Sequence, residues 1–289
     1  MGRLLDRAKA HVGRDLAGLL DGGHYALVHT RSLEFDDLRP YVPGDDVRDI
    51  DWKASARSGD VLIKRFVSER HHKILVIADA GRSMLGVSPS GEPKHVVATN
   101  VIGATGLITL RRSDEIGMVF GDARGSVDIR LRRGETHVEY LLAHYQQHVG
   151  TRPGRSAVFT QLAWAAEHYR RPHLIVVVSD EPDVGDRLAE VLTRIRGRHD
   201  VLWAMIADHQ AVGDADDVLG YDVVGGPPVL GRAELGDDVV DAYVAAERRR
   251  REELSEFMTE HAVPHALITG SAGIRSGLAW LTGVFARAG

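Results

Sequence analysis

The stretch that decides the fold of this chain is Ile74-Leu-Val-Ile-Ala-Asp-Ala-Gly-Arg-Ser83. Its first five residues are all apolar, as in a strand that is buried on both faces at the centre of a parallel sheet. A second strand of this kind is expected over residues 173–178, and it ends in Ser179-Asp180. Two buried strands that each end in polar residues indicate an α/β sheet with side chains available at its carboxyl edge.

Helices and strands alternate over the rest of the chain from residue 73. Helices are expected over residues 94–111, 136–148, 158–170, 186–196, 238–261 and from 274 onward, and further strands over 115–120, 126–131, 200–206 and 265–268. Only five residues separate strands 115–120 and 126–131, too few for a crossover helix, so these strands should pair antiparallel. The expected fold is therefore α/β: a doubly wound, mostly parallel six-stranded sheet with one antiparallel edge strand.

The part of the chain before residue 73 has a different character. Leucines and alanines at helical spacing predict an amphipathic helix within residues 1–20, and residues 21–72 are predicted to be rich in β-structure. We therefore expect three parts, over residues 1–20, 21–72 and 73–289. Within the third, Thr136-His-Val-Glu139 resembles a capping box that would begin the helix over 136–148.

The composition excludes several classes of protein. The net charge is -5, with both signs scattered along the chain, whereas a general nucleic-acid or anionic-membrane binder would show a basic face. There are no cysteines, which excludes disulfides, thiolate metal sites and cysteine nucleophiles and is consistent with the cytoplasm. The longest apolar tract, residues 96–110, is shorter than the roughly 20 residues of a membrane span. We expect a soluble, cytoplasmic protein.

Oxygen-bearing side chains are expected to gather at the carboxyl edge of the sheet. Asp79 and Asp180 follow the two most apolar strands, Ser83 lies in the loop after Asp79, and Thr160 falls near the start of the helix that precedes the Asp180 strand. Each alone would be an ordinary cap or turn residue, so the indication lies in their joint placement. Carboxylate and hydroxyl oxygens suit a hard cation such as Mg²⁺. In that interpretation Asp79 orients the cation and its waters, Ser83 and Thr160 donate oxygens, and Asp180 acts directly or through water.

The pattern Asp79-x-Gly81-x-Ser83, with Thr160 and Asp180 later, resembles the metal-ion-dependent adhesion site of von Willebrand factor A domains. That family's pattern is Asp-x-Ser-x-Ser, followed by a threonine and an aspartate. The resemblance implies a von Willebrand A-like domain and a metal site. Gly81 departs from the pattern, because the first serine of the motif is a metal ligand in the family.

A second resemblance lies upstream, in Arg39-Pro-Tyr-Val-Pro-Gly-Asp-Asp-Val-Arg-Asp-Ile-Asp-Trp-Lys-Ala-Ser-Ala-Arg57. This segment is similar to the hallmark of a bacterial family catalogued as domain of unknown function fifty-eight, whose members carry an A-like domain next. The segment interleaves three arginines with four aspartates. We interpret it as structural, with interlocked ion pairs and Trp52 fastening it to the sheet, and a partner-binding surface is the alternative.

The favoured function is a non-catalytic protein–protein interaction module. Its cation would keep an open position for a carboxylate of a protein partner. The family resemblance implies that this partner is a MoxR-type AAA+ ATPase, for which the chain would act as an adaptor. No G-x-x-x-x-G-K-[ST] loop is present, so the chain itself is not expected to hydrolyse ATP.

Two alternatives remain open. Gly81-Arg-Ser83-Met-Leu85 nearly matches the nucleophile elbow G-x-S-x-G of serine hydrolases, but Leu85 replaces its last glycine. In a hydrolase, Asp180 or Asp208 would be the acid and His209 or His265 the base. The third possibility is a structural scaffold in which Gly81 has made the metal site degenerate.

Overall fold

The computed structural model describes residues 2–12, 35–42, 45, 47, 50–66, 72–210, 220–221, 228–229 and 235–288. Its contacts divide the chain into two compact units. One comprises residues 28–71, and the other comprises residues 1–27 together with residues 72–289. The larger unit therefore contains the N-terminal helix as well as the sheet.

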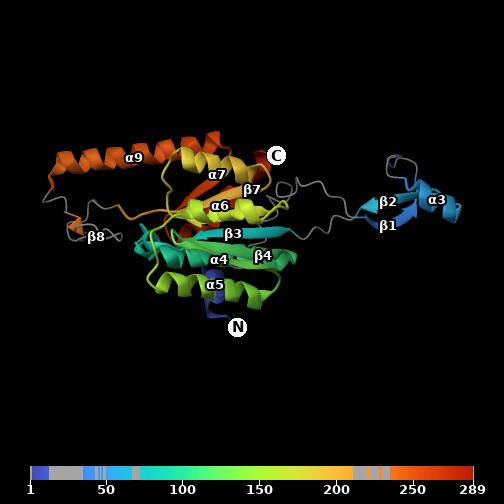
Figure 1. Ribbon diagram of the computed structural model, residues 1–289, viewed down its shortest axis with the longest axis horizontal. Helices are drawn as coiled ribbons and strands as arrows, with labels where there is room; N and C mark the ends of the chain where they lie inside the picture. Colours follow the sequence, from blue (N-terminus) through green and yellow to red (C-terminus); the bar gives the residue numbers. More distant parts are fainter. Residues whose placement is uncertain are drawn as a thin grey trace. The chain divides into compact units, whose positions relative to one another are not determined.

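A six-stranded sheet forms the centre of the larger unit (Figure 1). Its strands, in sheet order, are β10 (His265–Ile268), β7 (Asp200–Ile206), β6 (Leu174–Ser179), β3 (Lys73–Asp79), β4 (Glu115–Asp122) and β5 (Gly125–Arg132). Neighbours pair parallel except β4 and β5, which pair antiparallel at one edge. This confirms the predicted doubly wound α/β architecture with a single antiparallel edge strand in the sheet.

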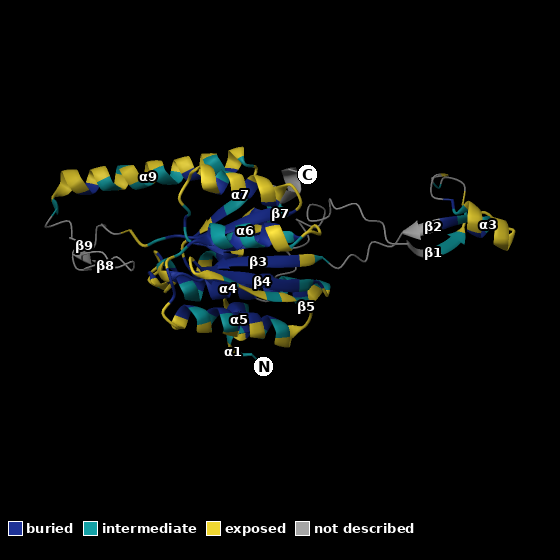
Figure 2. Ribbon diagram, viewed as in Figure 1, coloured by how far each residue is buried: buried dark blue, intermediate teal, exposed yellow. Residues whose placement is uncertain are grey.

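The burial of each strand follows from its place in the sheet. β3 is buried from Ile74 to Asp79, because helices cover both of its faces. The edge strand β5 has no buried residue, and each of its residues is either exposed or partly exposed. Figure 2 shows this difference between the centre and the edge of the sheet.

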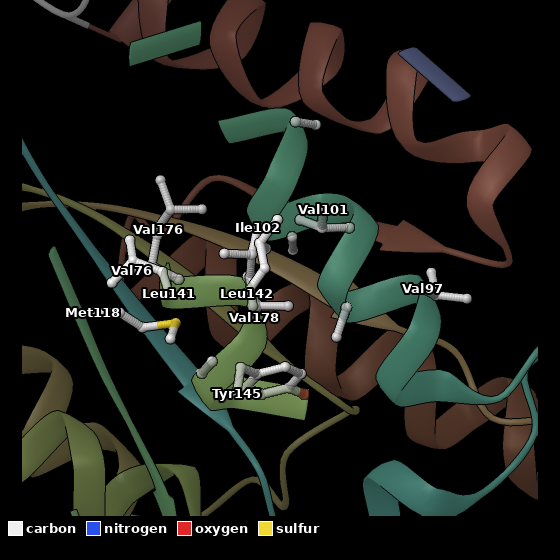
Figure 3. Packing of buried hydrophobic residues seen from close by; sticks show 14 of the residues in the cluster. Val76, Val97, Val101, Ile102, Met118, Leu141, Leu142, Tyr145, Val176 and Val178 are labelled. Carbon is white, nitrogen blue, oxygen red and sulfur yellow. The ribbon is translucent and has the colours of Figure 1, made fainter. Parts of the chain in front are cut away.

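Helices cover the two faces of the sheet and enclose two hydrophobic clusters. On one face lie α1 (Arg3–Val12), α4 (Lys94–Arg112), α5 (Glu135–Gly150) and α10 (Ile274–Ala288); on the other lie α6 (Val158–His168), α7 (Asp186–Arg196) and α9 (Asp237–Glu260). Side chains of β3 alternate between the clusters, since successive residues of a strand point to opposite faces. Figure 3 shows Val76 of β3 and Val178 of β6 against Ile102 of α4. Each such buried side chain contributes about 1.5–3 kcal/mol to stability.

The helix α1 is held by a residue to which the sequence assigned another role. The N-cap of α5 is Gly134, and no side chain caps that helix, so the predicted capping box was wrong. The Glu139 carboxylate instead accepts hydrogen bonds from the backbone N–H groups of Leu4 (3.1 Å) and Leu5 (2.9 Å) in the first turn of α1. Free N–H groups at a helix start attract a carboxylate from elsewhere in the fold as readily as from nearby sequence.

The smaller unit contains a two-stranded antiparallel sheet of β1 (Phe35–Pro40) and β2 (Leu62–Phe66). A short helix, α3 (Trp52–Ser58), lies between them in sequence and was not predicted. Asp51 caps it, because its side chain accepts from the N–H groups of Lys53 and Ala54. The helix ends at Gly59, whose φ of 84° is a backbone conformation that favours glycine.

The charged segment 39–57 matches its predicted ion pairing in part. Arg39 and Asp45 form a bidentate ion pair with N–O distances of 2.7 and 2.6 Å, and this pair lowers the pKa of Asp45. Asp51 serves as the helix cap. Trp52 is 69% exposed, and its role in fastening the segment to the sheet stays a prediction. Gly44, Arg48 and two aspartates of this segment lie outside the described residues.

The remaining described strands form a second small sheet in the larger unit. The pair β8 (Gly220–Tyr221) and β9 (Pro228–Val229) forms a small antiparallel sheet. Among the helices of the described ranges, none has the length and apolar character needed to cross a membrane.

Candidate functional site

The candidate site lies at the carboxyl edge of the parallel strands. Asp79 ends β3, Asp180 follows β6, and Asp208 follows β7 by two residues. β3 pairs with β4 on one side and with β6 on the other, and the chain winds outward from this point in both directions. Ligands of open α/β sheets bind beyond the carboxyl ends of the strands at such a switch point. The fold thus brings Asp79 and Asp180 to the position where a ligand site is expected.

Asp79 is buried, with 1% of its surface exposed. Its Oδ1 atom accepts a hydrogen bond from the Gly81 N–H at 2.8 Å, whereas its Oδ2 atom is buried without a hydrogen-bond partner in the described structure. Burial, and after it the charge of Asp180, raises the pKa of Asp79 to about 7. The Gly81 N–H, the Ser156 hydroxyl and the Lys94 ammonium lower this pKa and so offset part of the rise. An unpartnered buried carboxylate oxygen is costly unless a cation or a donor meets it.

Ser83 lies in the short 3-10 helix η3 (Arg82–Leu85) and interacts with a residue that the sequence did not single out. Its hydroxyl forms a short hydrogen bond with the Ser156 hydroxyl, and its backbone N–H donates to the Ser156 Oγ atom at 3.2 Å. A Cβ atom built on Gly81 would lie 2.5 Å from both the N and the Oγ atoms of Ser156. Glycine at position 81 therefore makes room for Ser156, whose hydroxyl takes the space of a side chain at 81.

The loop that carries Ser156 is anchored by Asp122, at the end of β4. The Asp122 carboxylate accepts hydrogen bonds from the N–H groups of Gly154 (2.7 Å) and Arg124 (2.8 Å) and from the Arg124 guanidinium. Although burial acts in the opposite direction, these donors hold the pKa of Asp122 well below its usual range. The Gly154 carbonyl in turn accepts from the Arg82 N–H at 2.8 Å. The loop and η3 are therefore joined by the backbone as well as by the two serines.

Lys94, the first residue of α4, brings a positive charge to this edge. Only 1% of its side chain is exposed, and its ammonium forms ion pairs with Asp180 Oδ2 at 3.6 Å and with Asp208 Oδ1. Burial raises the pKa of Asp180, and the Lys94 ammonium and the Ser83 hydroxyl oppose that shift. Two aspartates thus pair with one ammonium, and the partly ionised Asp79 beside them leaves an excess of negative charge at this edge.

Thr160 lies in the first turn of α6, after the loop of Ser156, and its side chain is partly exposed. Its backbone N–H donates to the Ala157 carbonyl. In the described part of the chain, no hydrogen bond joins its side chain to Asp79, Ser83 or Asp180. The fold therefore brings together three of the four predicted site residues by direct contact or charge, while Thr160 lies four residues after Ser156 in the first turn of α6.

The donor set fits a hard divalent cation. Nowhere in the described ranges do three or more carboxylate or imidazole side chains converge as a metal cluster, so a cation here would take its remaining ligands from hydroxyls and water. The Asp79 Oδ2 atom, the hydroxyls of Ser83 and Ser156 and the Asp180 carboxylate are all oxygens, which Mg²⁺ prefers. The free carboxylate oxygen and the excess negative charge both favour a cation.

Sequence reasoning missed Lys94 and Ser156 and assigned Asp208 only to a hydrolase. Asp208 had a signal, because it follows an apolar strand just as Asp180 does. Lys94 had a weaker one: a lysine at the start of a helix opposes the helix dipole, so it indicates a carboxylate nearby. No pattern in the sequence marks Ser156, since only the fold places it against Gly81.

The residues considered for hydrolysis have other contacts. The Ser83 hydroxyl interacts with another hydroxyl, that of Ser156. The imidazole of His265 lies 3.1 Å from the Ser255 hydroxyl, and the backbone N–H of His209 donates to the Val87 carbonyl. These contacts give no support to a triad built on Ser83.

Comparison with known proteins gives relatives of low identity. The chain is 26% identical over 222 residues to "Uncharacterized protein Mb1516" of Mycobacterium bovis, covering 74% of this chain and 68% of that protein. Similar solved structures include an aerotolerance-related membrane protein from Bacteroides fragilis (12% identity, TM-score 0.47, 73% of this chain and 98% of that one). A von Willebrand factor type A protein from Catenulispora acidiphila is also similar (13% identity, TM-score 0.42, 77% of this chain and 43% of that one).

The family assignment rests on sequence. The family described as "Protein of unknown function DUF58" matches residues 37–213. That range contains the charged segment 39–57 and every predicted site residue from Asp79 to Asp180, and it is more than half of the chain. The chain therefore belongs to the DUF58 family.

Proposed function

We propose that this protein is a protein–protein interaction module whose binding surface is the carboxyl edge of the sheet at Asp79, Ser83 and Asp180. A divalent cation, Mg²⁺ above all, would bind there and offer an open coordination position to a carboxylate of the partner. The observation that carries the proposal is the buried Asp79 Oδ2 atom, which has no hydrogen-bond partner in the described structure and lies next to hydroxyls and a second carboxylate.

Gly81 does not argue against a cation in this arrangement. The oxygen that a serine at position 81 would supply is replaced by the Ser156 hydroxyl, which lies against Gly81 and interacts with Ser83. The proposed ligand set is therefore Asp79, Ser83, Ser156 and Asp180, with Thr160 acting through water from the first turn of α6. Asp122 positions the set indirectly, because it holds the loop that carries Ser156.

The proposed partner is a MoxR-type AAA+ ATPase, for which this chain would act as an adaptor. The DUF58 membership supports this proposal, since the resemblance to that family is what implied the partner. A partner driven by ATP works where ATP is available, so the proposal places the protein in the cytoplasm. In this role the chain binds and positions and carries out no chemical step itself.

Calorimetric titration with Mg²⁺ and Mn²⁺ tests the cation site directly. We expect saturable binding by the wild type and loss of binding in Asp79→Ala, because this change removes the unpartnered carboxylate. Ser156→Ala should weaken binding several-fold. Asp238→Ala is the matched control, since Asp238 is an exposed aspartate in the first turn of α9, and it should bind as the wild type does.

The partner is tested by co-purification of the full chain with a MoxR-type ATPase from the same organism, in Mg²⁺ and in EDTA. Association that requires Mg²⁺ and Asp79 supports the proposal. Association that persists in EDTA and in Asp79→Ala favours the scaffold with a degenerate site. Ester hydrolysis that disappears in Ser83→Ala would favour the hydrolase instead.

A further inference from the structure

The buried ammonium of Lys94 is a feature that the proposed ligand set does not use. Only 1% of the Lys94 side chain is exposed, although it lies at the edge of the sheet where ligands bind. Transferring an ammonium from water to such a place is strongly unfavourable unless anions compensate it. Its two partners, Asp180 and Asp208, follow the neighbouring strands β6 and β7.

The place of Lys94 on its helix adds to this cost. Lys94 is the first residue of α4, and no acidic residue stands in the first turn of that helix. The N-terminus of a helix carries a partial positive charge, which repels a lysine. The packing of β3, β6 and β7 against α4 thus holds the Lys94 ammonium where both its burial and the helix dipole are unfavourable. The negative charges of Asp180 and Asp208 must compensate this cost.

Asp180 is shared between this ammonium and the proposed cation site. Its Oδ2 atom is 3.6 Å from the Lys94 ammonium, while its charge also acts on Asp79. A divalent cation that binds Asp180 would therefore lie close to the Lys94 ammonium. Two positive charges a few ångström apart repel each other strongly in a buried site, where bulk water does not screen them. Asp208, whose side chain is 51% exposed, can keep the ammonium when Asp180 is taken by another cation.

We propose that Lys94 is a tethered counter-ion of Asp180 and Asp208, which neutralises Asp180 in the absence of a divalent cation and which that cation must displace. This inference rests on the proposed cation site and adds the regulation of its affinity. The site would stay formed without metal, and its affinity for Mg²⁺ would be lower than its oxygen ligands alone would give.

The first test measures the affinity for Mn²⁺ of the full chain by calorimetry. Lys94→Met keeps the length of the side chain and removes its charge, so we expect binding at least about tenfold tighter than in the wild type. Lys73→Met is the matched control, because Lys73 is an exposed lysine at the other end of β3, and it should leave the affinity unchanged. The double variant Asp79→Ala/Lys94→Met should not show the tighter Mn²⁺ binding of Lys94→Met.

The second test needs no metal. Thermal unfolding in EDTA is compared for Lys94→Met, Asp180→Asn and the double variant, with Lys94→Gln as a substitute if Lys94→Met does not fold. Lys94→Met should lower the Tm by at least about 5 °C, because it leaves the Asp180 carboxylate without its counter-ion, and Asp180→Asn should lower it less, because Lys94 keeps Asp208. The decrease in Tm of the double variant should be much smaller than the sum of the decreases in the two single variants.

The outcomes separate this inference from the proposed function. Tighter Mn²⁺ binding in Lys94→Met together with non-additive melting supports the inference. Wild-type binding that does not tighten in Lys94→Met overturns the inference and leaves the cation site standing. Non-additive melting with no metal binding in any variant overturns the cation site and supports Lys94 as the counter-ion. Additive melting overturns the inference.

Discussion

The Oγ atom of Ser156 lies 2.5 Å from the position that a Cβ atom on Gly81 would take, so a side chain at position 81 and the present place of Ser156 exclude each other. The two residues are therefore best understood together. Glycine at 81 removes one hydroxyl from the edge of the sheet, and the loop before α6 brings another into the same space.

Restoring the serine of the adhesion motif is expected to harm the protein. Gly81→Ser should lower the free energy of unfolding by about 1–3 kcal/mol, because the added atoms meet the backbone and hydroxyl of Ser156. It should also weaken Mg²⁺ binding. Urea unfolding and calorimetry check both. Gly150→Ser is the control, since nothing lies within 4 Å of a Cβ atom there, and a destabilisation equal to that of Gly81→Ser would contradict the explanation.

The anchoring of the Ser156 loop by Asp122 leads to a second prediction. Asp122→Ala should cost about 3 kcal/mol of stability, because the buried Gly154 N–H loses its acceptor and the Arg124 guanidinium its partner. The Arg82 amide, which donates to the Gly154 carbonyl, should exchange with deuterium faster. Arg124→Ala should cost under about 1 kcal/mol, since that side chain is 62% exposed. Unchanged exchange at Arg82 would show that Asp122 does not hold the loop.

Stability at mildly acidic pH should depend on His199. Its two ring nitrogens are buried without hydrogen-bond partners in the described structure, and burial, followed by the charge of His173, lowers its pKa from 6.5 to about 4. The unfolded chain therefore takes up a proton before the folded chain does. This contribution to stability is complete above pH 6.5 and is lost as the pH falls to 4, by at most about 3 kcal/mol.

The pH dependence can be isolated by comparing urea unfolding of the wild type and His199→Leu between pH 4 and pH 8. The difference between their free energies of unfolding should change in favour of the variant as the pH falls through this range. Apart from His173, whose charge is coupled to that of His199, the other groups titrate equally in both proteins and cancel. A difference that stays constant with pH would refute the assignment of this effect to His199.

The docking of α1 gives a fourth prediction. Glu139→Ala should cost about 1–2 kcal/mol and should make α1 more sensitive to proteolysis, because the N–H groups of Leu4 and Leu5 lose their shared acceptor. Glu135→Ala is the matched control on the same helix, since among the described residues Glu135 forms only an exposed ion pair with Lys9. Equal sensitivity of α1 in the two variants would rule out Glu139 as its anchor.

Much of the fold could be predicted from local patterns. Continuous apolar runs identified β3 and β6, and the five-residue spacing between residues 120 and 126 predicted the antiparallel pairing of β4 and β5. The helix α3 was missed because its seven residues carry too few apolar positions for a periodic signal. The capping box at Thr136 did not form, because the carboxylate of Glu139 binds the first turn of another helix, α1.

By itself the sequence determined the sheet, its central strands and the aspartates that follow them, because apolar runs and their polar ends are local properties of the chain. Only the tertiary structure decided what surrounds those aspartates. Ser83 and Ser156 are 73 positions apart, and Lys94 and Asp208 are 114 apart. Contacts of this kind depend on how the strands are ordered and how closely a loop approaches Gly81, and burial then gives these few charges and hydroxyls their energetic weight.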